Sequence, residues 1–253
     1  MNLTIIIPAY NEELRVVSTI DSVRQFLDDR SWTYEIIVVD DGSKDETAQR
    51  VEQACTTRQH LRLVCAESNQ GKGAAVRLGV EHAHGDIVGF IDADDKTDIS
   101  GLDEVFRHLE DGAQIVIGDR TLADTAIHVQ RRAYRELGSR LFRRLLRWWL
   151  GLGDYPDTQC GFKFYRTNVL RGLYQRARID GYMFDVELLV LAHQARYRID
   201  RIGVTWRDDP DSRFQPLSGS WRNIRELLRI RRLHVDELPD HDPSSFDSRP
   251  PTN

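Results

Sequence analysis

The chain has 253 residues, of which 40% are hydrophobic and 30% are charged, and its formal net charge is -5. This length allows one large domain or two small ones with a sizeable core, and the composition excludes a disordered polymer and a fibrous repeat. The near-neutral charge is not that of a general nucleic-acid binder, so we expect no nucleic-acid partner.

Strands and helices alternate through the first half of the chain. Short, β-rich apolar runs predict buried strands, and apolar residues at helical spacing predict helices between them. In chain order we expect strands at 3–7, 35–39, 61–65 and 86–91, and helices at 12–27, from Ser43 or Asp45 to Cys55, and at 74–83. Strands that alternate with helices predict an α/β fold with a mostly parallel sheet.

The pattern changes after a further strand at 115–118. In the second half we expect helices at 131–150, 166–176, 184–195 and 221–233, and a strand at 197–205. No linker divides residues 1–235, which we therefore assign to one domain. The Pro-, Asp- and Ser-rich residues 236–253 predict a disordered acidic tail.

Polar loops follow the predicted strands of the first half. In parallel α/β sheets the ligand lies beyond the carboxyl ends of the strands. We therefore expect four loops to converge in space: Pro8–Glu12, Asp40–Ser43, Asn69–Gly73 and Asp92–Asp95.

Asp92-Ala93-Asp94 directly follows the fourth strand. Two carboxylates at this spacing suit Mg²⁺ or Mn²⁺, which complete their coordination with substrate phosphates; the alternative is a solvated acidic turn. The turn Asn69–Gly73 opens a helix, so its amides could face a phosphate, or its glycines could serve backbone freedom alone.

In combination these segments are more specific than each alone. IPAYNEE (7–13), VVDDGSKDET (38–47), NQGKGAAVRLG (69–79) and DADD (92–95) occur in that order, and the chain thereby resembles the family 2 glycosyltransferases with the GT-A fold. DTQCGFKFY (157–165) resembles the dolichyl-phosphate β-glucosyltransferases and their bacterial relatives more than the dolichol-phosphate mannose synthases. The resemblance implies inverting transfer of a hexose from a nucleotide sugar to a polyprenyl phosphate.

The resemblance also implies roles for single residues. The nucleotide-sugar site would be formed by Pro8, Tyr10, Glu12, Asp40 or Asp41, Lys72, Asp92 and Arg213. Asp92 and Asp94 would hold the metal, and the following Asp95-Lys96 leaves a third metal ligand open. Lys72 has a structural role as its alternative. Arg213 would close a loop over the diphosphate, although Pro210-Asp211-Ser212 stands where relatives often show Pro-Gly-Ser.

The acceptor side is assigned to a second set of residues. Arg120 would approach the sugar or the acceptor phosphate, and Arg135 and Ser139, four apart on one helix face, could hold the same phosphate with Arg132 or Arg131. A phosphate acceptor is ionised at neutral pH and needs no general base. For an alcohol acceptor a base is required, and Asp185 is the first candidate and Asp157 the second; the alternative for Asp185 is a helix N-terminal acid.

Arginine dominates the basic residues, because only four of the 35 are lysines. The helix at 131–150, with seven arginines and Trp148 and Trp149, suits an anionic membrane surface, and the last helix continues this pattern. The alternative is a surface helix with solvated arginines. Three cysteines without metal spacing, no signal-peptide pattern and no apolar stretch of about 18 residues predict a peripheral protein on the cytoplasmic side of a membrane.

The expected donor is UDP-glucose, with GDP-mannose next. Two other functions stay open: a glycosyltransferase with a soluble or glycan hydroxyl acceptor, and a non-catalytic nucleotide-binding protein. The sequence does not indicate an oligomeric state.

Overall fold

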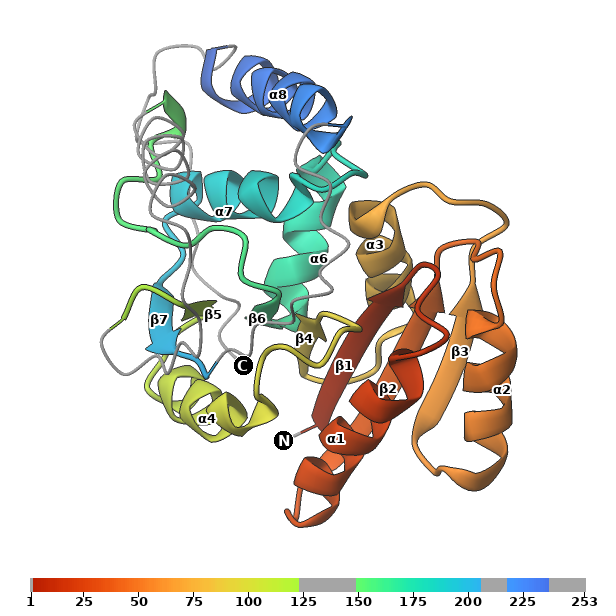
Figure 1. Ribbon diagram of the computed structural model, residues 1–253. Coiled ribbons are helices and arrows are strands. Elements are labelled where there is room, and N and C mark those ends of the chain that lie inside the picture. The colour runs from red at the N-terminus through yellow and green to blue at the C-terminus, as the bar shows by residue number, and fades with distance from the viewer. Residues whose placement is uncertain (1, 123–148, 206–217, 237–253) are drawn as a thin grey trace.

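The computed structural model describes residues 2–122, 149–205 and 218–236, and within them one seven-stranded sheet lies between two layers of helices (Figure 1). The strand order is β3-β2-β1-β4-β6-β5-β7. The pairs β1/β2, β2/β3, β1/β4 and β5/β7 are parallel, whereas β6 is antiparallel to both of its neighbours. The predicted mostly parallel α/β sheet is confirmed.

The first half of the chain forms the parallel part of the sheet. Its elements are β1 (Asn2–Ala9), α1 (Val16–Asp28), β2 (Thr33–Asp40), α2 (Thr47–Thr57), β3 (Leu61–Cys65), α3 (Lys72–His82) and β4 (Ile87–Ile91). Helix α1 begins four residues later than predicted, because the amides of Asn11 and Glu12 donate to Ser43 and Thr47 of the loop after β2. Residues 10–13 are therefore held as a loop beside the sheet edge.

The second half adds the antiparallel strand and further helices. Its elements are η1 (Ile99–Gly101), α4 (Leu102–Glu110), β5 (Ile115–Asp119), β6 (Phe162–Arg166), α6 (Thr167–Arg176), α7 (Phe184–Gln194), β7 (Ile199–Gly203), α8 (Ser218–Arg231) and a π-type turn (Arg232–Asp236). Helix α4 and strand β6 were not predicted from the sequence. Of the predicted helix at 131–150 only Trp149 and Leu150 are described, and the predicted tail beyond Asp236 lies outside the described residues.

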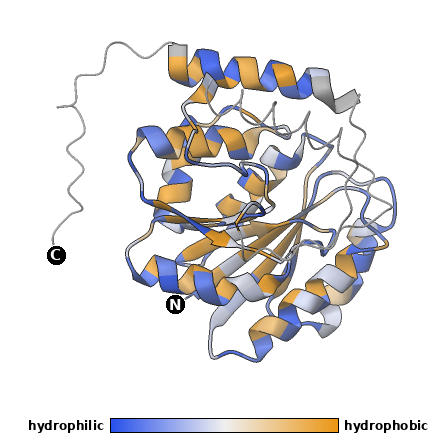
Figure 2. Ribbon diagram, turned by 60° about the vertical axis from the view of Figure 1, so that its left-hand side comes forward, coloured by the Kyte–Doolittle hydropathy of each residue, from blue (hydrophilic) through white to orange (hydrophobic). Residues whose placement is uncertain are grey.

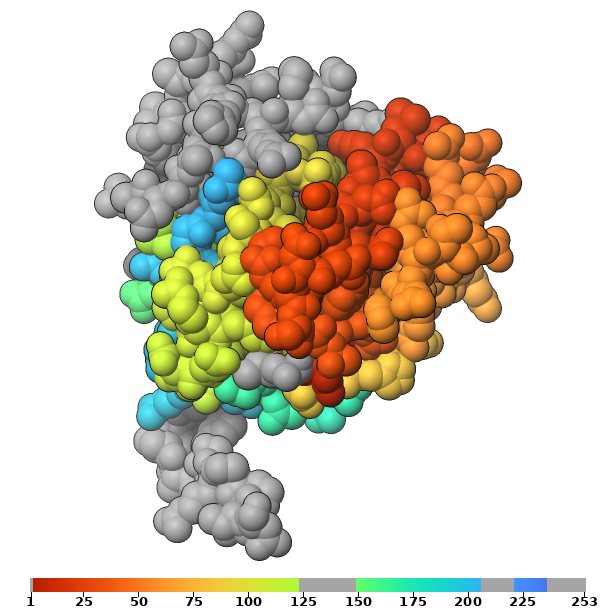
Figure 3. Space-filling view, turned by 90° about the horizontal axis from the view of Figure 1, so that it is seen from below, coloured from red at the N-terminus to blue at the C-terminus, as the bar shows by residue number. Residues whose placement is uncertain are grey.

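Both faces of the sheet are covered, which explains the continuous apolar runs of its strands. Ile5 and Ile7 of β1 pack in the layer of α1, α2 and α4, and Ile6 packs in the opposite layer of α3, α6 and α7. All five residues of β4 are buried. Figure 2 shows apolar strands enclosed between helices, and Figure 3 shows the face that α1, α2 and α4 cover.

Helix α8 is attached to the outer side of α7 (Figure 1). Its Leu227 and Ile230 are buried in the core of that layer. At its end, His234 Nε2 lies 2.7 Å from the buried carboxylate of Glu187 on α7. The contacts of α8 with the core fix the position of its N-terminal part, which carries Arg222.

Candidate active site

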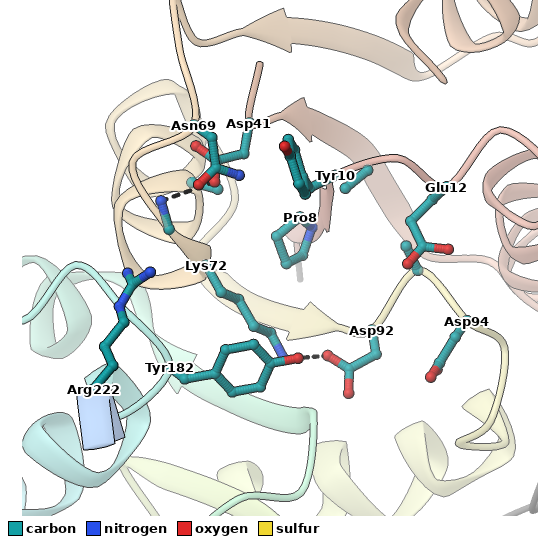
Figure 4. Close-up of a pocket in the computed structure, with 14 residues that line it drawn as sticks. Pro8, Tyr10, Glu12, Asp41, Asn69, Lys72, Asp92, Asp94, Tyr182 and Arg222 are labelled. Carbon is teal, nitrogen blue, oxygen red and sulfur yellow. Dashed lines mark hydrogen bonds and ion pairs between the residues drawn. The ribbon is translucent and has the colours of Figure 1, made fainter. Parts of the chain in front are cut away.

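The four polar loops meet at one cavity of about 350 Å³ beyond the carboxyl ends of β1, β2 and β4 (Figure 4). The predicted residues that line it are Pro8, Tyr10, Glu12, Asp41, Lys72, Asp92 and Asp94. The convergence expected from the strand order is therefore present. The functions assigned to these residues stay predictions.

One end of the cavity contains Asp41, which is almost fully buried. The amides of Gln70 and Gly71 donate to its two carboxylate oxygens, each at 2.9 Å. Gly71 has a φ of +116°, which only glycine adopts readily, and a Cβ there would lie 2.5 Å from the carbonyl oxygen of Asp180. Burial raises the pKa of the Asp41 carboxyl despite the two amide hydrogen bonds. Two amides of the glycine-rich turn thus bind the Asp41 carboxylate. A contact of these amides with a phosphate stays a prediction.

Asp40 does not line the cavity. Its Oδ2 accepts from the amide of Ser43 at 3.1 Å and so shapes the turn after β2. Of the two aspartates that the sequence left open, Asp41 is the one that lies in the cavity wall.

The loop after β1 is tied to the loop after β2. Asn11 has a φ of +56°, its amide donates to Ser43 Oγ at 2.9 Å, and its Oδ1 accepts from the amide of Lys44 at 2.8 Å. The amide of Glu12 donates to Thr47 Oγ1 at 2.8 Å. These bonds hold Tyr10 and Glu12 at the cavity.

Asp92 and Asp94 line the opposite end of the cavity (Figure 4). The ammonium of Lys72 contacts Asp92, and that of Lys96 lies 3.2 Å from Asp94. Burial alone would raise the pKa of Asp92, but the charge of Lys72 and its hydrogen bond hold that pKa below the usual value. Asp92 is therefore a carboxylate at neutral pH.

The two carboxylates fit a hard divalent cation. The described parts of the chain contain no group of three His, Cys, Asp or Glu side chains suited to an ion. Mg²⁺ is commonly held by one or two carboxylates, with water and substrate phosphates at its other positions. Gly161 faces Asp92, and a Cβ at this glycine would overlap the Asp92 carboxylate. Gly161, in the segment DTQCGFKFY, therefore leaves space for the Asp92 carboxylate, which would be one of the ligands of such a cation.

Two buried ion pairs contain the residues that were predicted to be catalytic. The Arg120 guanidinium donates to both oxygens of Asp157, at 2.7 and 2.8 Å. Lys163, which is fully buried, donates to Asp185 at 3.1 Å. Asp157 and Asp185 are buried, and neither they nor Arg120 is among the residues that line the cavity. The structure shows their ion pairs, and their catalytic roles stay predictions.

Tyr182 and Arg222 line the cavity but were not predicted to do so. Tyr182 lies in the loop before α7, and its ring centroid is 5.8 Å from the ammonium of Lys72. Arg222 lies in the first turns of α8 and is ion-paired with Glu226 at 3.1 Å. In the sequence, Arg222 resembled the other arginines of a surface helix, so no local signal distinguished it.

The described residues do not include the rest of the predicted site residues, which are Arg132, Arg135, Ser139 and Arg213. Among the residues that are described, no helix is both long and apolar enough to cross a membrane.

Residues 4–173 match glycosyl transferase family 2. The chain is 34% identical over 251 residues to the dolichyl-phosphate β-glucosyltransferase ALG5D of Trichomonas vaginalis, and the match covers 94% of this chain and 76% of the relative. It is 31% identical to the human dolichyl-phosphate β-glucosyltransferase, over 92% of this chain and 76% of that protein.

A solved structure also shares the fold. Glucosyl-3-phosphoglycerate synthase from Mycobacterium tuberculosis, in complex with Mn²⁺, UDP and glucosyl-3-phosphoglycerate, superposes with a TM-score of 0.70 at 24% identity. The match covers 94% of this chain and 81% of the synthase.

Proposed function

The chain belongs to glycosyl transferase family 2, and from that premise we propose that it transfers glucose from UDP-glucose to the phosphate of a polyprenol. Two relatives that match most of this chain are dolichyl-phosphate β-glucosyltransferases, which supports both the sugar and the class of acceptor. The observation that carries the proposal is the cavity in which Asp41 lies at one end and Asp92 and Asp94 at the other.

The donor would lie along this cavity. We assign its nucleoside to the end formed by Tyr10 and Asp41 and its diphosphate to the end formed by Asp92 and Asp94. Lys72 lines the cavity between these two ends, and its ammonium forms an ion pair with Asp92. At this position the ammonium can also attract a diphosphate. A bound Mg²⁺ or Mn²⁺ supplies a Lewis acid that offsets the charge on the leaving nucleoside diphosphate.

The acceptor phosphate would attack the anomeric carbon directly, with inversion. A phosphate monoester has a second pKa of about 6, so it is ionised at neutral pH and needs no general base. The ion pair of Asp157 with Arg120 supports this route, because a buried carboxylate that already accepts two hydrogen bonds from a guanidinium is poorly placed to take a proton from an acceptor. Asp185 is also buried and accepts a hydrogen bond from Lys163. Arg120, with the undescribed Arg132, Arg135 and Ser139, is proposed to orient the acceptor.

We place the reaction at a membrane surface on the cytoplasmic side. Trp221 and Leu228 of α8 are 73% and 51% exposed, and Arg225 and Arg232 are exposed on the same helix region. Exposed tryptophan and arginine side chains together suit an anionic bilayer. The free thiols Cys55, Cys65 and Cys160 support a reducing compartment.

The test is transfer of labelled glucose from UDP-glucose to a short polyprenyl phosphate in the presence of Mn²⁺. We expect a glucosyl phosphopolyprenol, little product from GDP-mannose, and loss of turnover in Asp92→Asn/Asp94→Asn. A matched control, Asp29→Asn/Asp154→Asn, removes the same charge at exposed positions and should retain activity. Transfer only to a saccharide hydroxyl would contradict the proposed acceptor, and undiminished activity of the Asp92/Asp94 variant would contradict the metal site.

A further inference from the structure

Lys96 folds back onto Asp94 in the loop after β4. Its ammonium is 3.2 Å from Asp94 Oδ2, and its backbone amide is 3.4 Å from Oδ1 of the same carboxylate. Asp95, between them, has a φ of +53°, an uncommon conformation that turns the chain back on itself. A local backbone turn therefore holds the ammonium on the carboxylate.

This ion pair differs from an ordinary exposed pair. The side chain of Lys96 is only 12% exposed and that of Asp94 23%, so both groups are largely withdrawn from solvent. Asp94 also lines the cavity, where the other predicted metal ligand, Asp92, is contacted by Lys72. Each of the two carboxylates thus already carries an ammonium group of the chain.

A divalent cation at Asp94 would meet this positive charge. To coordinate Asp94 it must displace Lys96 or remain within a few ångströms of it, and both alternatives weaken binding. The diphosphate of a donor brings negative charge to the same end of the cavity and offsets the repulsion.

We propose that Lys96 is a built-in counter-cation of Asp94 that keeps the affinity of the nucleotide-free protein for Mg²⁺ or Mn²⁺ low. The cation then binds well only together with the nucleoside diphosphate. This inference rests on the proposed function for the identity of the ion, but it concerns binding and needs no sugar transfer.

The test is Mn²⁺ titration of the purified protein, followed by electron paramagnetic resonance of free Mn²⁺, with and without UDP. Lys96→Met should bind Mn²⁺ about tenfold more tightly than the original protein when UDP is absent, because one positive charge close to the ion is removed. The difference should shrink when UDP is present. Lys96→Arg keeps the charge and should keep the weak binding.

Lys44→Met is the matched control, because it removes an exposed lysine that does not line the cavity. It should leave the Mn²⁺ affinity unchanged. Adding Asp92→Asn/Asp94→Asn to Lys96→Met should abolish the tight binding, which would locate the ion. The melting temperature of each variant identifies loss of folding.

Equal or weaker Mn²⁺ binding by folded Lys96→Met would overturn the proposal, as would tight binding that survives the loss of Asp92 and Asp94. If Lys96→Met binds Mn²⁺ more tightly at these aspartates but no variant transfers glucose, the counter-cation stands and the proposed reaction fails. The two conclusions are thus separable.

Discussion

Arg120 and Asp157 form a bidentate ion pair across 37 residues of sequence, with Nε–Oδ2 and Nη2–Oδ1 distances of 2.7 and 2.8 Å. The backbone amide of Arg120 also donates to Oδ2, at 3.0 Å. Asp157 therefore fixes both the side chain and the backbone at the end of β5. We interpret Asp157 as a positioning residue for Arg120, which fits better than a role as a general base.

Asp157→Asn should destabilise the protein by about 2 kcal/mol, because it leaves the largely buried Arg120 without its carboxylate. Urea denaturation at pH 7 measures the loss of free energy of unfolding. Asp154→Asn removes an exposed carboxylate three residues away and should change that free energy little. Equal stability of the two variants would contradict a structural role for the pair.

The same pair predicts a pH dependence. Burial by itself raises the pKa of Asp157. The hydrogen bonds and charge of Arg120 lower this pKa by more than burial raises it, so the folded-state pKa lies below the usual value. A lowered folded-state pKa contributes stability above the unfolded-state pKa of about 4, and this contribution is lost as the pH falls through the folded-state pKa. The stability difference between the original protein and Asp157→Asn should be level from about pH 5 to 8 and shrink below about pH 4. Denaturation curves across this range measure it.

Gly161→Ala should impair the proposed cation site with little effect on the fold, because the added Cβ would overlap the carboxylate of Asp92. We expect Mn²⁺ binding in the presence of UDP to weaken about tenfold and transfer to fall in parallel. Gly153→Ala is the matched control, because a Cβ there would meet nothing within 4 Å. Normal Mn²⁺ binding by Gly161→Ala would show that Asp92 can move without consequence.

Arg222→Met should weaken UDP binding about fivefold, because this guanidinium lies at the end of the cavity formed by Asp41 and Gly71. Calorimetry with UDP measures the dissociation constant. Arg225→Met removes an exposed arginine of the same helix that is absent from the cavity lining, and should bind UDP normally. Equal affinities in the two variants would exclude Arg222 from the proposed nucleotide site.

The cysteines should differ sharply in reactivity. Cys160 is buried, and this burial raises the pKa of its thiol to about 12, so little thiolate forms at neutral pH. Cys65 is exposed. Alkylation of the native protein at pH 8, followed by mass spectrometry, should modify Cys65 first and Cys160 only after unfolding. Early modification of Cys160 would indicate that its surroundings open in solution.

Strand β6 shows where prediction from the sequence failed. Lys163 interrupts the apolar run of Phe162, Phe164 and Tyr165, so the sequence pattern does not predict a uniformly buried strand. The structure nevertheless buries Lys163 completely, because its ammonium donates to the Cys160 carbonyl at 2.6 Å and to Asp185 at 3.1 Å. A charged residue can lie in a core strand when such partners exist. Here one partner is the nearby Cys160 carbonyl, and the other, Asp185, is contributed by helix α7.

The sequence by itself determined the alternation of strands and helices and the convergence of four polar loops. Both follow from local rules: the spacing of apolar side chains, and the placement of ligands beyond the carboxyl ends of parallel strands. Only the tertiary structure decided that Asp41 rather than Asp40 lines the cavity, that Lys96 contacts Asp94, and that Arg222 arrives from α8. These outcomes depend on backbone turns and on the packing of segments distant in sequence, and neither is encoded in the periodicity of one segment.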